Sequence, residues 1–468
     1  AFSFMKHVGL NVAADAFMTL AYTGVRGGYV VLTADDPSCH SSQNEQDNRH
    51  FAHMSYTPVL EPSNPREIYH FYKEAARLAR RYHMPIILRL TTHVCHAKEK
   101  VAFSAFKPIQ PDDTPRFNVA DGPQIPLTEE ALIKKREALR KLGEVERIAN
   151  ESNLNQLVDN GNSRRGVITM GLPYLSLMDV LEKASEKPDV LKLGFVHPIP
   201  RKIVEAFVKS HDEVKILEEL DDILEKDVKS LAYDAGLKTH ILGKMDLGTW
   251  VGEYTADKVQ DVLKDTWPDM LESRRPAAVL PEVVLARPPQ MCPGCGHRSA
   301  FHAIKKALSG QDITVADIGC HTLGYLPPYE MGQVMMCMGA SPGIGSGLSL
   351  FNTSRKVVVF MGDSTFFHAG LPGIINSVFN QHPITLILME NGTTAMTGHQ
   401  PHPGVNMKDF NLTGYGRVSI EDVVRAIGVP RVEVIKPYRV NKSIAAIKEA
   451  IDYEGVSVII SKEACTLY

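Results

Sequence analysis

Two uninterrupted apolar runs, each followed by a polar turn, constrain the fold of this chain more than any other feature. Residues 356–361 and 384–389 are rich in Val, Ile and Leu, which is typical of parallel strands buried on both faces of a sheet. Asp363 follows the first run in a Gly-Asp-Ser turn, and Asn391 follows the second. Because ligands of α/β sheets bind outside the carboxyl ends of the strands, the pattern predicts an α/β fold in which both side chains share a site.

The residues after the two runs carry the oxygen donors that Mg²⁺ prefers. Mg²⁺ is bound octahedrally, commonly by a carboxylate, carbonyl oxygens and the phosphates of a ligand. Asp363 supplies a carboxylate, Asn391 an amide oxygen, and Thr393 a backbone carbonyl two residues later. Each motif alone is more readily explained as a simple turn, but the pair predicts a site for Mg²⁺ and a diphosphate.

A glycine-rich segment, residues 339–347, leads into an apolar helical pattern. Glycines allow a backbone to approach a ligand closely, and the amino end of a helix favours an anion. We therefore expect Gly339 and Ser341 to lie close to the diphosphate. A packing turn is the alternative.

Four of the seven cysteines follow a pattern. Cys292 and Cys295 form a Cys-x-x-Cys pair, Cys320 follows a predicted strand, and Cys465 follows the last apolar run. Thiolates with this spacing hold either a tetrahedral Zn²⁺ or an iron–sulfur cluster, and buried free cysteines are a third option. An odd cysteine count argues against a disulfide framework. The other three cysteines, predicted to be ordinary buried residues, are Cys39, Cys95 and Cys337.

The rest of the chain reads as further α/β units joined by polar segments. Residues 1–125 have the strand–helix–strand rhythm of a parallel sheet and end in a linker rich in Pro, Asp and Gln. Residues 126–164 are predicted to be a charged helical linker, residues 165–273 a second α/β unit with one strand over 190–196, and residues 274–468 the unit with the polar turns. A chain of 468 residues is expected to hold about two to four domains.

Composition indicates a soluble globular protein. Apolar residues make up 44% and charged residues 22%, which excludes a disordered chain. The net charge of −3 gives no reason to expect nucleic acid or an anionic membrane as partner. No apolar stretch approaches the ~20 residues of a membrane span, and nothing at the amino end resembles a signal peptide. We expect a cytoplasmic protein.

Several motifs together point to one family. They are His40–Asp47 with Arg49, Cys292–His297, Asp317–Cys320, Gly362–Ser364 and Asn391–Gln400. With them the chain resembles the 2-oxoacid:ferredoxin oxidoreductases, most closely the large (alpha) subunit of the indolepyruvate type. The resemblance covers essentially the whole chain, and the order of units fits: a pyrimidine-type thiamine domain, a third domain similar to the carboxyl-terminal domain of transketolase, and a diphosphate-type domain.

The resemblance implies a thiamine-diphosphate-binding fold of parallel sheets flanked by helices. It implies that Cys292, Cys295, Cys320 and Cys465 hold a [4Fe–4S] cluster. His7, His321 and His399 become candidates for contacts with thiamine or substrate, with a structural histidine as the alternative for each. The cofactor-binding residues implied are Gly339, Ser341, Gly362, Asp363, Ser364, Asn391, Thr393, Thr394 and Met396, with Asp363, Asn391 and Thr393 as ligands of Mg²⁺.

The activity implied is oxidative decarboxylation of an aryl 2-oxoacid with coenzyme A, giving an arylacetyl-CoA and CO₂, with electrons passing through iron–sulfur clusters to ferredoxin. Met396 stands where pyruvate-type relatives carry Asn, an exchange that suits an aromatic substrate. A small beta subunit and a dimer or heterotetramer are expected. The activating Glu of thiamine enzymes, normally upstream of Lys6, and a ferredoxin-like tail with further clusters are expected outside these residues. The alternatives are a non-oxidative 2-oxoacid decarboxylase and a non-catalytic thiamine-binding subunit with structural zinc.

Overall fold

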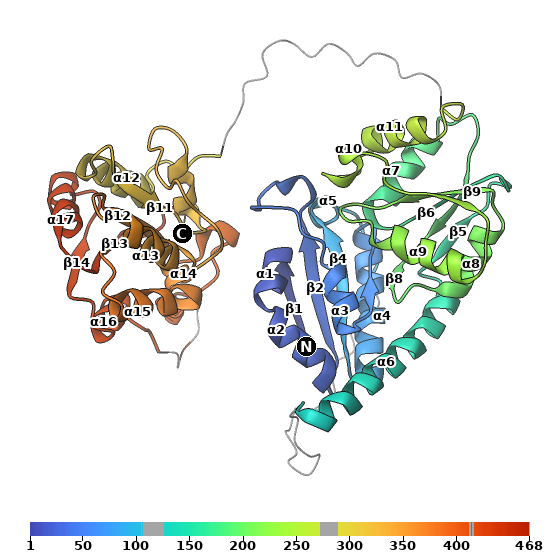
Figure 1. Cartoon of the computed structure of the whole chain (residues 1–468), viewed down its shortest axis with the longest axis horizontal. Helices are drawn as coiled ribbons and strands as arrows, with labels where there is room; N and C mark the ends of the chain where they lie inside the picture. The colour runs from blue at the N-terminus through green and yellow to red at the C-terminus, as the bar shows by residue number, and fades with distance from the viewer. Residues whose placement is uncertain (104, 106–125, 272–288, 411–412, 414–415, 468) are drawn as a thin grey trace. The chain divides into compact units, whose positions relative to one another are not determined.

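Three five-stranded β-sheets, each dominated by parallel pairing, form the framework of the chain (Figure 1). The structure is a computed structural model that describes residues 1–103, 105, 126–271, 289–410, 413 and 416–467. Unit 1, Ala1–Ala278, contains two of the sheets, and unit 2, Val279–Tyr468, contains the third. This confirms the predicted α/β class with parallel sheets flanked by helices. Residues 106–125, which hold the predicted linker rich in Pro, Asp and Gln, and residues 272–288 lie outside the described residues.

The first sheet of unit 1 has the strand order β1-β2-β4-β3-β8, in which only β8 runs antiparallel to its neighbour. Its strands are β1 (Phe2–Lys6), β2 (Tyr29–Asp35), β3 (Val59–Leu60), β4 (Pro85–Thr91) and β8 (Phe195–His197). Helix α4 (Pro65–Tyr82) starts where the Asn64 side chain accepts a hydrogen bond from the N–H of Glu67, as helix amino ends commonly do. Its apolar face, which includes Phe71 and Leu78, packs on β2 and β4.

The second sheet of unit 1 has the order β10-β9-β6-β7-β5, with β5 antiparallel to β7. Its strands are β5 (Gln156–Val158), β6 (Arg165–Thr169), β7 (Asp189–Lys192), β9 (Glu213–Leu217) and β10 (His240–Leu242). One hydrophobic cluster joins it to the first sheet, because Val31 and Ile87 pack together with Ile168 and Ile216. The two sheets therefore belong to one compact body.

The single strand predicted over residues 190–196 is wrong. The segment forms β7 in the second sheet and β8 in the first, and it breaks at Gly194. A side chain at Gly194 would lie 2.5 Å from the backbone oxygen of Leu154, so the chain can cross there only because the residue is glycine. The apolar side chains of residues 190–196 suit a strand in either sheet. The close approach of Leu154 marks Gly194 as the place where the strand breaks.

The charged helix of unit 1 is shorter than the predicted stretch 126–164. Helix α6 covers Thr128–Glu151, and β5 follows it. Asn155 explains the stop, since its side chain donates to the carbonyl of Ala149 at 2.7 Å and accepts from the N–H of Gly194 at 2.9 Å. One side chain thus satisfies an open carbonyl at the helix end and fixes the turn.

The sheet of unit 2 is wholly parallel, with the order β11-β12-β13-β15-β14. Its strands are β11 (Ile313–Val315), β12 (Val357–Gly362), β13 (Ile384–Glu390), β14 (Arg431–Ile435) and β15 (Ser457–Lys462). Alternate residues of β12 bury opposite faces: Val358 and Phe360 join the cluster with α12 and α17, whereas Val359 and Met361 join the cluster on the other face. Continuous apolar strands are the expected consequence of a sheet covered on both faces.

The helices complete both units. Those of unit 1 not yet given are α1 (His7–Val12), α2 (Ala14–Thr23), α3 (Arg49–Ser55), α5 (Thr92–His96), α7 (Gly171–Leu181), α8 (Arg201–Lys209), α9 (Ile223–Asp234), α10 (Leu247–Trp250) and α11 (Ala256–Thr266). Those of unit 2 are α12 (Gly296–Ala307), α13 (Ser341–Phe351), α14 (Asp363–Thr365), α15 (Leu371–Phe379), α16 (Ile420–Ala426) and α17 (Val440–Asp452). No helix among the described residues is long and apolar enough to cross a membrane.

Candidate active site

A cavity of about 180 Å³ lies in unit 2, where β12 and β13 end. These two strands are neighbours, and Gly362 stands opposite Met389 in the register. The cavity is lined by both polar turns, by the segment after β11 and by Cys320. Its lining includes the predicted residues Gly362, Asp363, Ser364, Asn391, Thr393, Thr394, Met396 and His321.

Asp363 joins the two strand ends. It is the first residue of α14, directly after β12, and only 3% of its surface is exposed. Its Oδ2 accepts hydrogen bonds from the N–H groups of Asn391 at 2.9 Å and Gly392 at 2.8 Å, which belong to the turn after β13. The convergence expected from the two apolar runs is therefore present in the fold, and a buried carboxylate stands at its centre.

The turn after β13 offers further oxygen groups. Asn391 Oδ1 accepts from the N–H of Thr393 at 3.1 Å, and Thr394 Oγ1 donates to Ser364 Oγ at 2.9 Å. Thr393 is 1% exposed, and its hydroxyl has no hydrogen-bond partner among the described residues. Buried hydroxyls normally have a partner, so the turn fits a ligand that brings acceptor oxygens, such as a diphosphate.

His402 is a residue that the sequence reasoning missed. It is 4% exposed, and its Nε2 lies 3.2 Å from Asp363 Oδ2. The Nδ1 atom accepts a hydrogen bond from the N–H of Gly404 at 3.1 Å, which assigns the ring proton of the neutral imidazole to Nε2. This nitrogen lies beside the carboxylate without a hydrogen bond to it, and it has no hydrogen-bond partner among the described residues. Its only signal in the sequence is its place two residues after the motif that ends at Gln400.

Two histidines beside the cavity are buried and neutral. His321 follows Cys320, and burial lowers the pKa of its ring to about 4 although Asp363 opposes the shift. Burial, with a smaller contribution from His321, also lowers the pKa of His297 to about 4. Their ring centroids lie 6.4 Å apart. Both therefore act near neutral pH as uncharged donors or acceptors.

The other predicted histidines lie elsewhere. His399 is half-buried in the turn after β13 and has a positive φ of 63°, and it is not among the described residues that line the cavity. His7 belongs to unit 1, where it is fully buried at the carboxyl end of β1. A role for His7 and His399 stays a prediction.

The amino end of α13 already holds an anion, which is the carboxylate of Asp317. Asp317 Oδ1 accepts from the N–H of Gly339 at 2.9 Å, and Oδ2 accepts from the N–H of Ser341 at 3.1 Å. Asp317 is fully buried. The glycine-rich segment therefore binds a negative charge as expected, but the charge comes from the chain itself. A contact of Gly339 and Ser341 with a cofactor stays a prediction.

The four patterned cysteines lie next to the cavity. Cys320 lines it, and burial together with the neighbouring thiols of Cys295, Cys465 and Cys292 raises the pKa of Cys320 to about 11. The N–H of Cys465 donates to the backbone oxygen of Asn391 at 3.0 Å, so this cysteine is bonded directly to the second polar turn. The other three thiols therefore lie close enough to Cys320 to influence its ionisation.

The other cysteines differ from the prediction. Cys95 and Cys337 are exposed and Cys39 is half-buried, so the expectation that all three are buried is wrong. Cys95 lies in the short helix α5, and Cys337 lies in the loop before α13. The apolar character of a cysteine side chain did not predict that these two are exposed.

The loop before α3 is exposed in its first half and buried in its second. Ser41 and Gln43 are exposed, whereas Asp47 and Arg49 are fully buried. Arg49 Nε bonds Asp47 Oδ1 at 2.9 Å, and its Nη1 bonds Glu218 Oε2 at 2.6 Å. This part of the motif ties the two sheets of unit 1 together by buried ion pairs.

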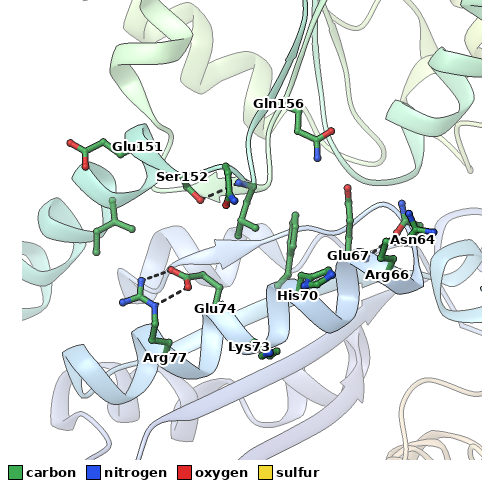
Figure 2. A pocket seen from close by; sticks show the side chains of 14 residues that line it. Asn64, Arg66, Glu67, His70, Lys73, Glu74, Arg77, Glu151, Ser152 and Gln156 are labelled. Atoms are coloured by element: carbon green, nitrogen blue, oxygen red, sulfur yellow. Dashed lines mark hydrogen bonds and ion pairs between the residues drawn. The ribbon is translucent and has the colours of Figure 1, made fainter. Parts of the chain in front are cut away.

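A larger cleft, of about 1160 Å³, lies in unit 1 between α4 and the end of α6 (Figure 2). It is lined by charged side chains, several of which already form ion pairs. Figure 2 shows Arg77 bonded to Glu74, with Nε 2.8 Å from Oε2, and Arg66 pairs with Glu99 at 2.6 Å. Nothing in this cleft points to a particular ligand.

Comparisons with known proteins agree with the site in unit 2. Residues 317–461 match the family described as "Thiamine pyrophosphate enzyme, C-terminal TPP binding domain". The chain is 41% identical over 476 residues to "Indolepyruvate oxidoreductase subunit IorA" of Methanothermobacter marburgensis, covering 100% of this chain and 76% of that protein. The chain belongs to the IorA family. The IorA protein of Archaeoglobus fulgidus is 38% identical over 480 residues, covering 99% of this chain and 74% of that one.

Membership of the IorA family confirms the family expected from the motifs, and with it the class of oxidoreductase. Asp363 and Asn391 lie inside the matched thiamine-binding region, whereas Cys292, Cys295 and Cys465 lie outside it. A solved 2-oxoglutarate:ferredoxin oxidoreductase from Magnetococcus marinus aligns with a TM-score of 0.35 and 20% identity over 38% of this chain and 65% of that chain. A likeness that weak supports no argument about function.

Proposed function

We propose that this IorA-type chain, with thiamine diphosphate, oxidatively decarboxylates an aryl 2-oxoacid of the indolepyruvate kind. Coenzyme A would take up the acyl group, giving an arylacetyl-CoA and CO₂, and electrons would pass through iron–sulfur clusters to ferredoxin. The name of the relatives supports the substrate. The observation that carries the proposal is that a buried carboxylate between two strand ends and Cys320, a thiol influenced by the other three patterned cysteines, line one cavity.

Asp363, the side-chain oxygen of Asn391 and the carbonyl of Thr393 would hold Mg²⁺, and Ser364 and Thr394 would surround the diphosphate. The convergence of these groups and the unpartnered hydroxyl of Thr393 support this assignment. A carboxylate, carbonyl oxygens and phosphates are the donors that Mg²⁺ commonly combines. When bound, thiamine diphosphate supplies the chemistry of carbon–carbon cleavage, and the protein orients it and tunes its surroundings.

Cys292, Cys295, Cys320 and Cys465 would hold a [4Fe–4S] cluster rather than zinc. With Zn–S bonds of about 2.3 Å, tetrahedral geometry puts sulfur atoms about 3.8 Å apart. Among the residues that the structure describes, no three cysteines have sulfur atoms within 4.8 Å of one another. A cluster of four irons spans more space than one ion, so the wider spacing favours the cluster. The bond from Cys465 to Asn391 would couple it to the thiamine site.

Two features bear on substrate and partners. Met396 lines the cavity and is 51% exposed, so it offers an apolar surface that suits an aromatic side chain. A small beta subunit, ferredoxin as electron acceptor, a dimer or heterotetramer, and a cytoplasmic location complete the proposal.

The proposal is tested on the full-length protein purified anaerobically with its second subunit. Iron and acid-labile sulfide without zinc, together with ferredoxin reduction that requires indolepyruvate and coenzyme A, are the expected results. Because further clusters are expected in the full-length protein, Cys295→Ala should contain about four fewer iron atoms per chain than the wild type and retain thiamine diphosphate binding, whereas Cys95→Ala, at an exposed position, should change neither. Zinc in place of iron, or decarboxylation without ferredoxin reduction, would contradict the proposal.

A further inference from the structure

Three side chains of unit 1 bring metal-binding atoms to one point although they come from distant parts of the chain. His53 lies on α3, His197 on β8 and Asp227 on α9. One donor atom from each lies within 4.8 Å of the other two. In the described part of the chain this is the one group of three or more His, Cys, Asp or Glu side chains with that spacing.

The distances suit ligands of one ion better than they suit a hydrogen bond. His53 Nε2 lies 3.6 Å from Asp227 Oδ2, which is longer than an N–H···O hydrogen bond. Donors of a tetrahedral zinc ion, at bond lengths of about 2.0–2.2 Å, lie about 3.3–3.6 Å apart. The rings of His53 and His197 have centroids 4.2 Å apart and are tilted by 37°, so the two imidazoles lie next to each other.

Two ring nitrogens in this group lack partners. The Nε2 atoms of His53 and His197 are both buried, and neither has a hydrogen-bond partner among the described residues. A buried polar atom without a partner is costly, and a bound ion would satisfy both.

The two arginines that influence the carboxyl group of Asp227, Arg49 and Arg201, are each paired with another carboxylate. Arg49 lies close enough to influence His53 and Asp227, but its guanidinium is paired with Asp47 and Glu218. The side chains of His53 and Asp227 are 36% and 26% exposed, which leaves an open side for water as a further ligand.

We propose that His53, His197 and Asp227 bind one divalent first-row transition-metal ion, Zn²⁺ or an ion of similar preference, through two imidazole nitrogens and a carboxylate oxygen. Imidazole and carboxylate donors together suit these ions. The ion is separate from the Mg²⁺ and cluster sites of unit 2, and its assignment does not depend on the proposed activity.

A metal ion at this point cross-links unit 1. Strand β8 belongs to the first sheet, whereas Leu224 and Val228 of α9 pack with Val214 and Ile216 of the second. Figure 1 shows α3, β8 and α9 in the same region of unit 1. An ion that binds only the folded state stabilises it, so saturating Zn²⁺ should raise the Tm of unit 1 by roughly 5 °C or more.

The test counts Zn²⁺ on the full-length protein. The protein is first treated with a weak chelator, then dialysed against Zn²⁺ alone under anaerobic conditions, and the bound ions are counted by mass spectrometry. We expect Asp227→Asn and His197→Ala to bind one Zn²⁺ fewer per chain than the wild type, or to bind it at least tenfold more weakly. His50→Ala is the matched control, because His50 lies one turn earlier on α3, outside the group of three, and pairs with Asp221 at 2.7 Å; it should retain the ion.

A second readout protects the test from a variant that fails to fold. Asp227→Asn preserves side-chain shape at a half-buried position, and its Tm without metal should match the wild type within about 2 °C. The rise in Tm on adding Zn²⁺, followed by tryptophan fluorescence, should disappear in this variant and remain in His50→Ala. Equal Zn²⁺ stoichiometry and an equal rise in Tm in all proteins would overturn the proposal.

Discussion

Replacing Asp317 by alanine should destabilise unit 2 strongly. Its carboxylate is fully buried and, besides the adjacent N–H of Ile318, accepts the N–H groups of Gly339 and Ser341 at the start of α13. Hydrogen bonds to a charged group contribute about 1.5–3 kcal/mol each, so two bonds amount to about 4 kcal/mol of unfolding free energy. For a unit of this size about 3 °C of Tm corresponds to 1 kcal/mol, which predicts a Tm lower by roughly 12 °C.

The assay can separate the two units. The two tryptophans of the chain, Trp250 and Trp267, both lie in unit 1, so fluorescence follows unit 1 while calorimetry follows both. Asp317→Ala should lower a calorimetric transition and leave the fluorescence transition in place. Asp312→Ala is the matched control, since Asp312 also accepts two backbone N–H groups, of Ser309 and Lys356, but is only half-buried. If the Tm of Asp317→Ala falls no further than that of Asp312→Ala, the reasoning about the buried carboxylate is refuted.

Two more predictions concern buried groups near the ion-pair network and the site. His402→Ala should weaken Mg²⁺ binding in the presence of thiamine diphosphate about tenfold. The reason is that the imidazole beside Asp363 would no longer hold the carboxylate in place. An unchanged Kd for Mg²⁺ in titration calorimetry would contradict this. Burial raises the pKa of Glu219 from 4.5 to about 7, so the folded state holds the proton more tightly and unit 1 loses stability as the pH rises from about 4.5 to 7. Glu219→Gln should remove this loss and be more stable than the wild type at pH 8 by about 3 kcal/mol. Urea unfolding followed by tryptophan fluorescence measures the difference. If the unfolding free energies of wild type and variant depend on pH in the same way, this mechanism is ruled out.

The features that the sequence predicted well depend on local pattern and on general rules of parallel sheets. The apolar runs at 356–361 and 384–389 became β12 and β13, because strands covered on both faces need apolar side chains at every position. Their polar turns converge because parallel neighbours end at one edge of the sheet. The meeting of Asp363 and Asn391 could therefore be derived without coordinates.

The features that it missed depend on contacts between distant residues. Nothing local shows that Leu154 approaches Gly194 and splits one apolar run between two sheets. Nothing local shows that Asp317 occupies the amino end of α13, since 22 residues separate the carboxylate from Gly339. The role of His402 likewise requires a fold that brings it to Asp363, and no spacing rule links the two positions.

The buried charges of unit 1 illustrate the same difficulty. Asp47 and Arg49 belong to a polar segment of the sequence, yet both are fully buried. Burying an arginine is favourable only when its charge is paired, and the partner, Glu218, lies 169 residues away. The polarity of a segment therefore did not predict its exposure.

The most direct test of the account is an anomalous diffraction measurement on crystals of the protein grown with thiamine diphosphate and Mn²⁺ in place of Mg²⁺. The account predicts one strong peak about 2.1–2.2 Å from a carboxylate oxygen of Asp363, the side-chain oxygen of Asn391 and the carbonyl oxygen of Thr393, with the remaining ligands supplied by the diphosphate and water. A manganese ion bound to the diphosphate but out of contact with Asp363 and Asn391 would contradict the claim that the ends of β12 and β13 form the cofactor's metal site.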